Sequence, residues 1–165
     1  MARAPTPARF YRAGHWFAED SVGLLMKRLV VEMSARIEQR LAPHGLTDAQ
    51  WRPLLRLRTG GPCTVLEMAR WLQLDPSSTT RLLGRLDRKG LLRRTRSIAD
   101  RRIVQLQLTD QGEAAIAAVP EVLAELMNEL LAGFTRSEWR TLVDLLQRML
   151  TNGALIRQGA MKGRR

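Results

Sequence analysis

The chain has 165 residues, of which 45% are hydrophobic, and a formal net charge of +11. This length allows one domain, or one closely packed pair of domains, and the excess of Lys and Arg predicts an acidic partner. The sequence contains no apolar run near the roughly 18 residues of a membrane-spanning helix, and its N-terminus lacks the apolar segment of a signal peptide. We therefore expect a cytoplasmic protein without a membrane partner. The single cysteine excludes an intramolecular disulfide framework and shows no metal-ligand spacing with the two histidines, so no metal or other cofactor is expected.

The first predicted element is a long amphipathic helix over residues 21–42. Its apolar side chains recur every three to four residues, and Pro43 and Gly45 end it. Three later helix starts carry a capping box, in which a Thr precedes a Gln or Glu by three positions. These boxes predict helices that begin near residues 48, 65 and 136.

The helix predicted over residues 76–89 has a well-marked start and end. Asp75 is a good N-cap, Pro76 suits the first helical position, and Gly90 favours a stop. One stripe of this helix is apolar, whereas the other side carries groups that donate hydrogen bonds to phosphates or base edges. Those side chains are Ser77, Ser78, Thr80, Arg81, Arg85 and Arg88. A solvated surface helix is the alternative interpretation.

The segment after this helix favours a nucleic-acid partner. Residues 91–96 and 104–108 are predicted to pair as a hairpin, because apolar residues alternate with glutamine in the second of them. Residues 75–102 contain nine Lys or Arg and three Asp, a local net charge of +6. A helix followed by a cationic hairpin is the arrangement with which a winged helix binds DNA.

Two leucine-rich helices complete the chain. One is predicted after Thr109 and runs towards Leu131 with a bend at Pro120, and the other begins near residue 136. Their leucines present more apolar surface than a single helical pair covers. A homodimer interface would bury this surface, and the alternative is that it completes a monomeric core.

The residues of the hairpin carry a family resemblance. The run from Asp100 to Gly112 resembles the wing signature of the multiple antibiotic resistance regulator (MarR) family, which is Asp-x-Arg followed by a strand that ends in Leu-Thr-x-x-Gly. Residues 77–86 resemble the recognition helix of that family, and residues 89–92 its junction between helix and wing. The match extends with lower specificity over residues 21–152. It implies a mainly α-helical fold with a small β-hairpin wing and a homodimer with intertwined terminal helices.

This resemblance implies a division of the chain into segments. A winged helix-turn-helix DNA-binding domain is expected over residues 46–109, embedded between dimerisation helices at residues 21–45 and 110–155. Residues 1–20 are expected to form an N-terminal extension, and residues 156–165 a basic C-terminal tail.

Two recognition helices related by a two-fold axis would read a pseudo-palindromic operator in double-stranded DNA. The expected DNA-binding residues are Ser77, Ser78, Thr80, Arg81, Arg85, Arg88, Arg96, Arg101 and Arg102. Arg81 is expected to lead base reading, and Arg102 to enter the minor groove. Asp100 is expected to pair with a nearby arginine and hold the wing in shape. Arg93 and Arg94 are interpreted as phosphate contacts or solvated charges.

A small-molecule site is also expected. The run from Thr47 to Arg52 resembles the second helix of family members that respond to aromatic acids, so a small aromatic carboxylate is the expected effector. The candidate ligand-binding residues are His15, Trp16, Ser21, Arg36, Arg40 and Trp51. Some relatives carry an anion-binding arginine one turn after the tryptophan, but this chain has Leu55 there, which leaves His15, Arg36 or Arg40 for the carboxylate. Core packing is the alternative role of Trp51.

The sequence thus predicts a cytoplasmic, nucleoid-associated homodimeric repressor that an aromatic carboxylate releases from its operator. The alternative is a sequence-tolerant architectural DNA-binding protein without an effector. Cys63 is interpreted as a buried or incidental cysteine and not as a peroxide sensor. The chain is not expected to be an enzyme, because no nucleophile, base and acid stand in a recognisable catalytic arrangement.

Overall fold

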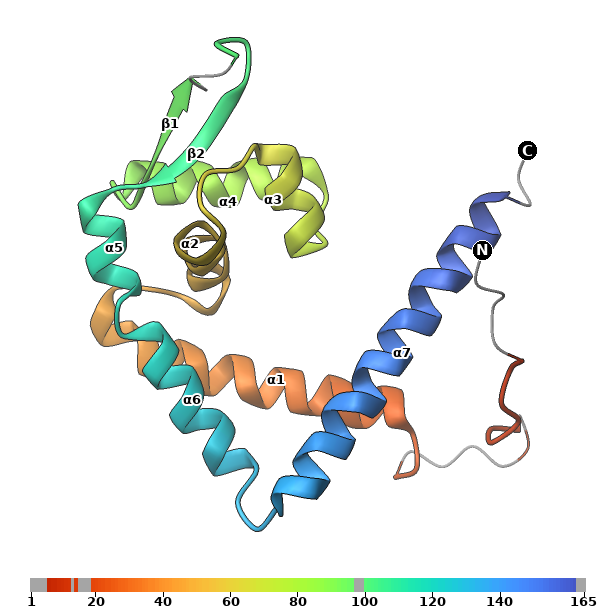
Figure 1. The fold of residues 1–165 in the computed structure, drawn as a ribbon. Coiled ribbons are helices and arrows are strands. Elements are labelled where there is room, and N and C mark those ends of the chain that lie inside the picture. Colours follow the sequence, from red (N-terminus) through yellow and green to blue (C-terminus); the bar gives the residue numbers. More distant parts are fainter. Residues whose placement is uncertain (1–5, 13, 15–18, 97–99, 163–165) are drawn as a thin grey trace. The chain divides into compact units, whose positions relative to one another are not determined.

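The computed structural model describes residues 6–12, 14, 19–96 and 100–162, with side chains up to residue 157. The described chain is mainly helical and contains one two-stranded antiparallel hairpin, as expected (Figure 1). It divides into two compact units, residues 26–127 and residues 1–25 with 128–165, and each is described by itself. His15 and Trp16, two of the candidate ligand-binding residues, lie outside the described residues.

The unit of residues 26–127 holds the helices and strands around the predicted DNA-binding segment. Its elements are most of α1 (Val22–Leu41), η2 (Ala42–His44), α2 (Asp48–Gly60), α3 (Val65–Leu72), α4 (Pro76–Arg88), β1 (Leu92–Arg96), β2 (Val104–Leu108), α5 (Asp110–Ile116) and the larger part of α6 (Val119–Leu130). The predicted starts of α2 and α3 are confirmed, because Thr47 and Thr64 are N-caps with complete capping boxes.

One apolar core holds this unit together. Its fully buried side chains are Leu41, Leu54, Met68, Leu83, Leu86, Leu106, Ile116, Val119 and Leu126. Helices α2, α3 and α4 each contribute to it, and α4 contacts both of the others as well as β1. Because each buried leucine stabilises the fold by about 1.5–3 kcal/mol, this packing fixes α4 on its apolar side.

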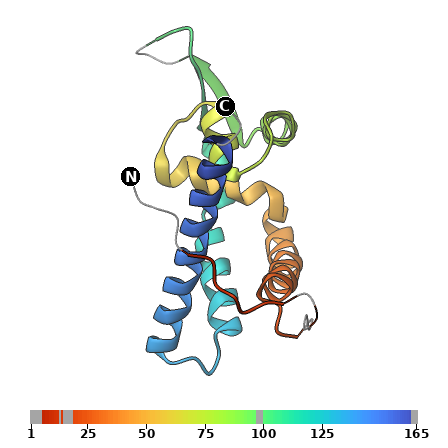
Figure 2. The same cartoon turned by 90° about the vertical axis from the view of Figure 1, so that its right-hand side faces the viewer.

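The hairpin pairs in a simple register and gains a third, short partner. Leu92 lies opposite Leu108, and Arg96 lies opposite Val104. Cys63, between α2 and α3, forms an isolated bridge with Leu106, whose N–H donates to the Cys63 carbonyl at 2.7 Å. This bridge ties the middle of β2 to the segment between α2 and α3. The far end of the hairpin projects beyond the helices of its unit (Figure 2).

The helix expected after Thr109 does not bend at Pro120 but breaks before it. α5 ends at Ile116 and α6 begins at Val119, with Pro120 in the first turn of α6. Proline has no N–H and its ring clashes with the carbonyl four residues earlier, which here belongs to Ile116. That carbonyl instead accepts a hydrogen bond from Arg58 Nη1 of α2 at 3.3 Å. The interruption therefore falls one turn ahead of the proline.

The other unit contains α7 (Arg136–Lys162) and the chain around the start of α1. The predicted capping box is confirmed, because Thr135 N–H donates to Glu138 and Glu138 N–H donates to the Thr135 hydroxyl. The helix continues to Lys162, so most of the segment expected as a tail is helical. Although α7 has 27 residues, neither it nor any other helix in the described ranges is apolar enough along its length to cross a membrane.

Candidate nucleic-acid interface

The start of α4 is fixed by its cap. Asp75 Oδ1 accepts hydrogen bonds from the N–H groups of Ser77 and Ser78, at 3.0 and 2.9 Å, and from the Ser77 hydroxyl at 2.6 Å. Hydrogen bonds from Ser77 and Ser78 hold the pKa of the Asp75 carboxyl well below its usual range. The carboxylate therefore stays charged at neutral pH and complements the positive end of the helix dipole.

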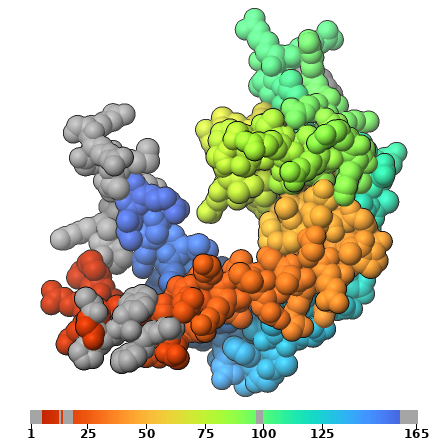
Figure 3. All heavy atoms as spheres, turned by 180° about the vertical axis from the view of Figure 1, so that it is seen from behind, coloured from red at the N-terminus to blue at the C-terminus, as the bar shows by residue number. Residues whose placement is uncertain are grey.

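The two sides of α4 are sharply different. Thr79, Leu83 and Leu86 are fully buried. The six residues expected to face DNA, Ser77, Ser78, Thr80, Arg81, Arg85 and Arg88, are all exposed. Figure 3 shows the surface of α4 below the projecting hairpin. The packing of one side thus leaves a continuous face of hydroxyl and guanidinium groups uncovered.

Internal hydrogen bonds limit what some of these groups can recognise. The Ser77 hydroxyl donates to Asp75, and the Thr80 hydroxyl donates to the Pro76 carbonyl at 2.8 Å. Each hydroxyl therefore offers a partner its acceptor lone pairs. Phosphate oxygens are acceptors as well, whereas the amino groups of adenine and cytosine are donors in the major groove. These two side chains suit base edges better than phosphates.

The hairpin supplies the second part of the surface. Arg96, Arg101 and Arg102 are exposed. Asp100 Oδ1 accepts a hydrogen bond from the Arg102 N–H at 2.9 Å, and the Asp100 carbonyl accepts one from the Ile103 N–H at 3.0 Å. By accepting these two backbone hydrogen bonds, Asp100 shapes the turn that presents Arg102.

Arg94 forms an ion pair within the protein. Its Nε lies 3.6 Å from Asp87 Oδ2, so it forms an ion pair between β1 and α4. An exposed pair of this kind contributes only about 0–1 kcal/mol to stability, but it orients the hairpin base relative to α4. This contact has no local sequence signal, because the pairing requires the turn at Gly90.

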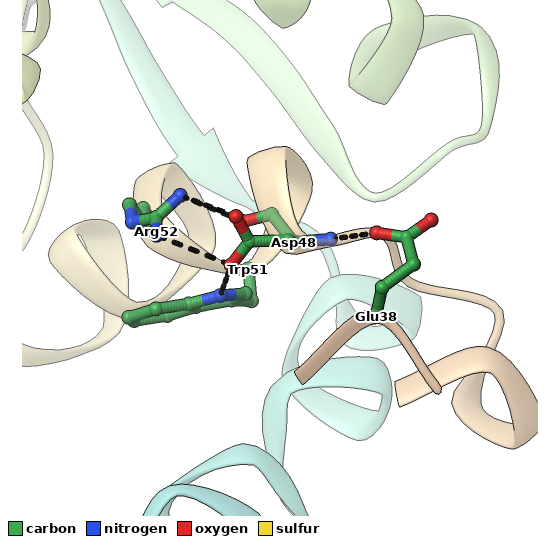
Figure 4. Close-up of polar contacts among 4 residues, drawn as sticks. All are labelled: Glu38, Asp48, Trp51 and Arg52. Carbon is green, nitrogen blue, oxygen red and sulfur yellow. Dashed lines mark hydrogen bonds and ion pairs between the residues drawn. The ribbon is translucent and has the colours of Figure 1, made fainter. Parts of the chain in front are cut away.

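Trp51 is held in place by its neighbours on α2. Its indole N–H donates to Asp48 Oδ1 at 3.0 Å, and Arg52 Nη1 donates to Asp48 Oδ2 at 3.1 Å (Figure 4). The Arg52 guanidinium carbon lies 4.9 Å from the centre of the indole ring, a cation–π contact. Glu38 of α1 accepts a hydrogen bond from the Asp48 N–H. Arg52 was not among the candidate ligand residues, although its position next to Trp51 was visible in the sequence.

The other described candidate ligand residues lie in two different units. Arg36 forms an ion pair with Glu32 at 2.6 Å, and Arg40 is half-buried on the same helix. Ser21 is buried, belongs to the unit of residues 1–25 and 128–165, and its Oγ accepts a hydrogen bond from Leu24 N–H. The ligand roles of these residues remain expectations.

Cys63 is a buried residue of the fold. Its side chain is 2% exposed, and burial raises the pKa of its thiol. Little reactive thiolate is therefore present at neutral pH. Within the described ranges, no group of three His, Cys, Asp or Glu side chains is placed to hold a metal ion.

The chain, including α4 and the hairpin, is similar to known proteins. The family model of the MarR family matches residues 46–104, which include α4 and the hairpin up to Val104. A mutant of MarR from E. coli, solved in complex with operator DNA, is 29% identical with a TM-score of 0.72, covering 78% of this chain and 93% of that one. A probable transcriptional regulator from Pseudomonas aeruginosa is 28% identical with a TM-score of 0.71, covering 79% and 98%. BpsR of Bordetella bronchiseptica, whose DNA binding is regulated by 6-hydroxynicotinic acid, is 26% identical with a TM-score of 0.71, covering 87% and 97%.

Proposed function

Because this chain belongs to the MarR family of transcriptional regulators, we propose that it is a homodimeric repressor that reads a pseudo-palindromic operator. Members of this family regulate transcription and are not enzymes. This chain is likewise a transcriptional regulator and not an enzyme. The observation that carries the proposal is the uncovered polar face of α4 beside the cationic hairpin. The E. coli relative in complex with operator DNA supports it.

In this proposal α4 lies in the major groove. Arg81 and Arg85 donate to guanine edges or phosphates, while Ser77 and Thr80 accept from base amino groups. Arg102 at the hairpin tip enters the adjacent minor groove, where a narrow A·T-rich stretch concentrates negative potential. Arg88, Arg96 and Arg101 contact phosphates and fix the register without reading sequence.

The homodimer is supported by apolar side chains that the single chain leaves exposed. On α7 these are Leu142, Leu145, Met149, Leu150 and Ile156, and on α1 they are Val22, Leu25, Met26, Leu29, Val30 and Val31. Exposed apolar residues repeated along a helix mark an interface, and most protein oligomers are two-fold dimers. A two-fold dimer presents two copies of α4 to half-sites about one helical turn apart.

The proposed effector is a small aromatic carboxylate that lowers operator affinity. Trp51 offers a flat surface oriented by Asp48, and BpsR, which is regulated by 6-hydroxynicotinic acid, supports this chemical class. A ligand that favours the non-binding conformation by about 1.4 kcal/mol lowers operator affinity tenfold. Arg36 is paired with Glu32, so a carboxylate that binds Arg36 must displace that ion pair. His15 and Arg40 are the other proposed partners of the carboxylate.

The test begins with selection of duplexes from a random library by the purified protein. The dissociation constant of the selected duplex is then compared with that of a scrambled duplex of the same length and composition at fixed salt. A repressor is expected to prefer the selected sequence by more than about 10³-fold. A sequence-tolerant architectural protein would bind both alike, and that outcome would reject the proposal.

The effector is tested with the selected duplex. 6-Hydroxynicotinate, hydroxybenzoates and pyridine carboxylates are titrated against the free protein and against its complex with the selected duplex. Linkage requires an effector to bind the DNA complex more weakly by the factor with which it lowers DNA affinity. Identical affinities in the two states would reject the effector and leave the DNA-binding proposal standing.

A further inference from the structure

Lys89 connects the end of the recognition helix to a distant corner of the fold. It is the C-cap residue of α4, and its Nζ donates to the Gly45 carbonyl and to Gln50 Oε1, both at 3.0 Å. These acceptors lie 44 and 39 residues earlier in the chain. A lysine ammonium has three donors and is usually solvated, so two hydrogen bonds to the protein are a specific use of this side chain.

Both acceptors belong to the α1–α2 corner, which comprises η2, Gly45 and the first turn of α2. Gln50 is 6% exposed, and its Oε1 also accepts the Thr47 N–H at 3.2 Å as part of the capping box. Gly45 has a φ of 67° and closes η2 through a hydrogen bond from its N–H to the Ala42 carbonyl at 3.0 Å. Lys89 is therefore attached to backbone and amide groups whose positions are already determined.

The same corner is held from α1. Glu38 accepts a hydrogen bond from the N–H of Asp48, the first residue of α2 (Figure 4). Asp48 follows Thr47, whose N–H donates to Gln50, and Gln50 accepts from Lys89. A nearly continuous series of hydrogen bonds thus runs from α1, through the first turn of α2, to the end of α4.

Polar contacts supplement the packing at this end of α4, where Asp87 also forms an ion pair with Arg94 of β1. Leu86 is the last buried residue of the helix, and the next buried residue is Leu91. Between them, Lys89 provides the attachment to the α1–α2 corner. Since a small rotation of α4 moves Arg81 and Arg85 relative to base edges, this attachment bears on sequence reading more than on nonspecific attraction to phosphates.

From these contacts we infer that Lys89 is a positioning residue, which transmits the geometry of the α1–α2 corner to the recognition helix and thereby sets operator specificity. This inference rests on the proposed function, because it needs α4 to read DNA. The competing role for Lys89 is a plain phosphate contact, which would add affinity for every sequence equally.

The first experiment compares Lys89→Met with Arg88→Met, which removes a neighbouring charge from the same end of α4. Lys89→Met is expected to weaken binding to the selected duplex about tenfold and binding to the scrambled duplex by no more than about twofold. Arg88→Met is expected to weaken both alike and to reduce the salt dependence. Lys89→Arg, which can donate to both acceptors, is expected to restore most of the preference.

The second experiment is a double-mutant cycle with Glu38→Ala, which removes the acceptor of the Asp48 N–H. This change is expected to weaken binding to the selected duplex several-fold, about threefold or more, in the wild-type background. In the Lys89→Met background its effect is expected to disappear, because the connection to α4 is already broken. Urea unfolding of each variant checks that it is folded, and Lys89→Gln replaces Lys89→Met if the latter is not.

The outcomes separate the inference from the proposed function. If the wild-type protein binds selected and scrambled duplexes alike, the proposed function fails, and the inference fails with it. If the wild type discriminates but Lys89→Met behaves as Arg88→Met does, Lys89 is a phosphate contact and the inference is wrong. Additive effects of Glu38→Ala and Lys89→Met would also overturn it.

Discussion

Helices α4 and α7 are both amphipathic, but the chain buries the apolar side of α4 and leaves that of α7 largely uncovered. In α4 the apolar residues Leu83 and Leu86 are fully buried, and the uncovered face is polar and cationic. In α7 the leucines are uncovered, and Leu145 and Leu150 are 43% and 67% exposed. An uncovered polar face can gain hydrogen bonds and ion pairs from a nucleic acid, whereas an uncovered apolar face gains from contact with protein. On this difference rests our proposal that α4 binds DNA and that α7 binds a second copy of the chain.

The largest expected effect comes from placing charges on the apolar face of α7. Leu142→Asp with Leu145→Asp places two carboxylates on its apolar face, and burying unpaired charge in an interface is strongly unfavourable. Sedimentation velocity is expected to show the dimer dissociation constant raised by at least about 100-fold, with a parallel loss of affinity for the selected duplex. Arg140→Ala, on the opposite side of the helix, serves as the control. A variant that remains dimeric like this control would show that α7 is not the interface.

The covered side of α4 is tested by its stability. Leu83→Ala is expected to lower the free energy of unfolding by about 2–5 kcal/mol, because a fully buried leucine leaves a cavity. Leu82→Ala, at a half-buried neighbouring position, is expected to cost less. Urea unfolding monitored by circular dichroism measures both. Equal costs would mean that the two positions are packed alike, against the described burial.

The uncovered side of α4 is tested by the affinity of variants for DNA and not by their stability. Arg81→Ala is expected to weaken binding to the selected duplex by about 1–3 kcal/mol and to relax the preference at one base pair of each half-site. Arg102→Ala is expected to act most on operators with A·T-rich flanks. Competition binding against single-base variants of the selected duplex measures both effects. Equal loss on selected and scrambled duplexes would reject base reading by Arg81 and groove reading by Arg102.

The smallest effect concerns the cap of α4 and its dependence on pH. The pKa of the Asp75 carboxyl is lowered in the folded protein by hydrogen bonds from Ser77 and Ser78. Its stabilising contribution is therefore fully present above the ordinary aspartate pKa of about 3.9 and declines as the pH falls below it. The difference in unfolding free energy between wild type and Asp75→Ala is expected to shrink between pH 7 and pH 2. A difference that stays constant or grows on acidification would contradict this role.

Local signals predicted much of the fold. The caps at Thr47, Thr64, Asp75 and Thr135 were found because a cap depends on residues within one turn of it. The hairpin was found from the alternation in residues 104–108. The interruption was predicted at Pro120 but lies between Ile116 and Val119. A proline disturbs the carbonyl four residues earlier and so acts one turn upstream.

Contacts between distant segments could not be predicted in this way. The bridge of Cys63 with Leu106, the ion pair of Arg94 with Asp87 and the attachment of Lys89 to the α1–α2 corner all require the tertiary fold. A lone cysteine after Gly-Gly-Pro carries no periodic signal of a strand, and a lysine at a helix end is usually solvated. The exposed face of α4 was predictable because it follows from helical period alone.

A dimeric repressor of the kind proposed reads one face of DNA with its two copies of α4. We would insert five base pairs between the half-sites of the selected duplex, which turns them about half a helical turn apart, and measure the dissociation constant at fixed salt. A dimer with fixed recognition helices is expected to lose affinity by at least about 100-fold, approaching the value for scrambled DNA. Unchanged affinity for the lengthened duplex would contradict the account, because it would show that the two copies of α4 do not read the operator together.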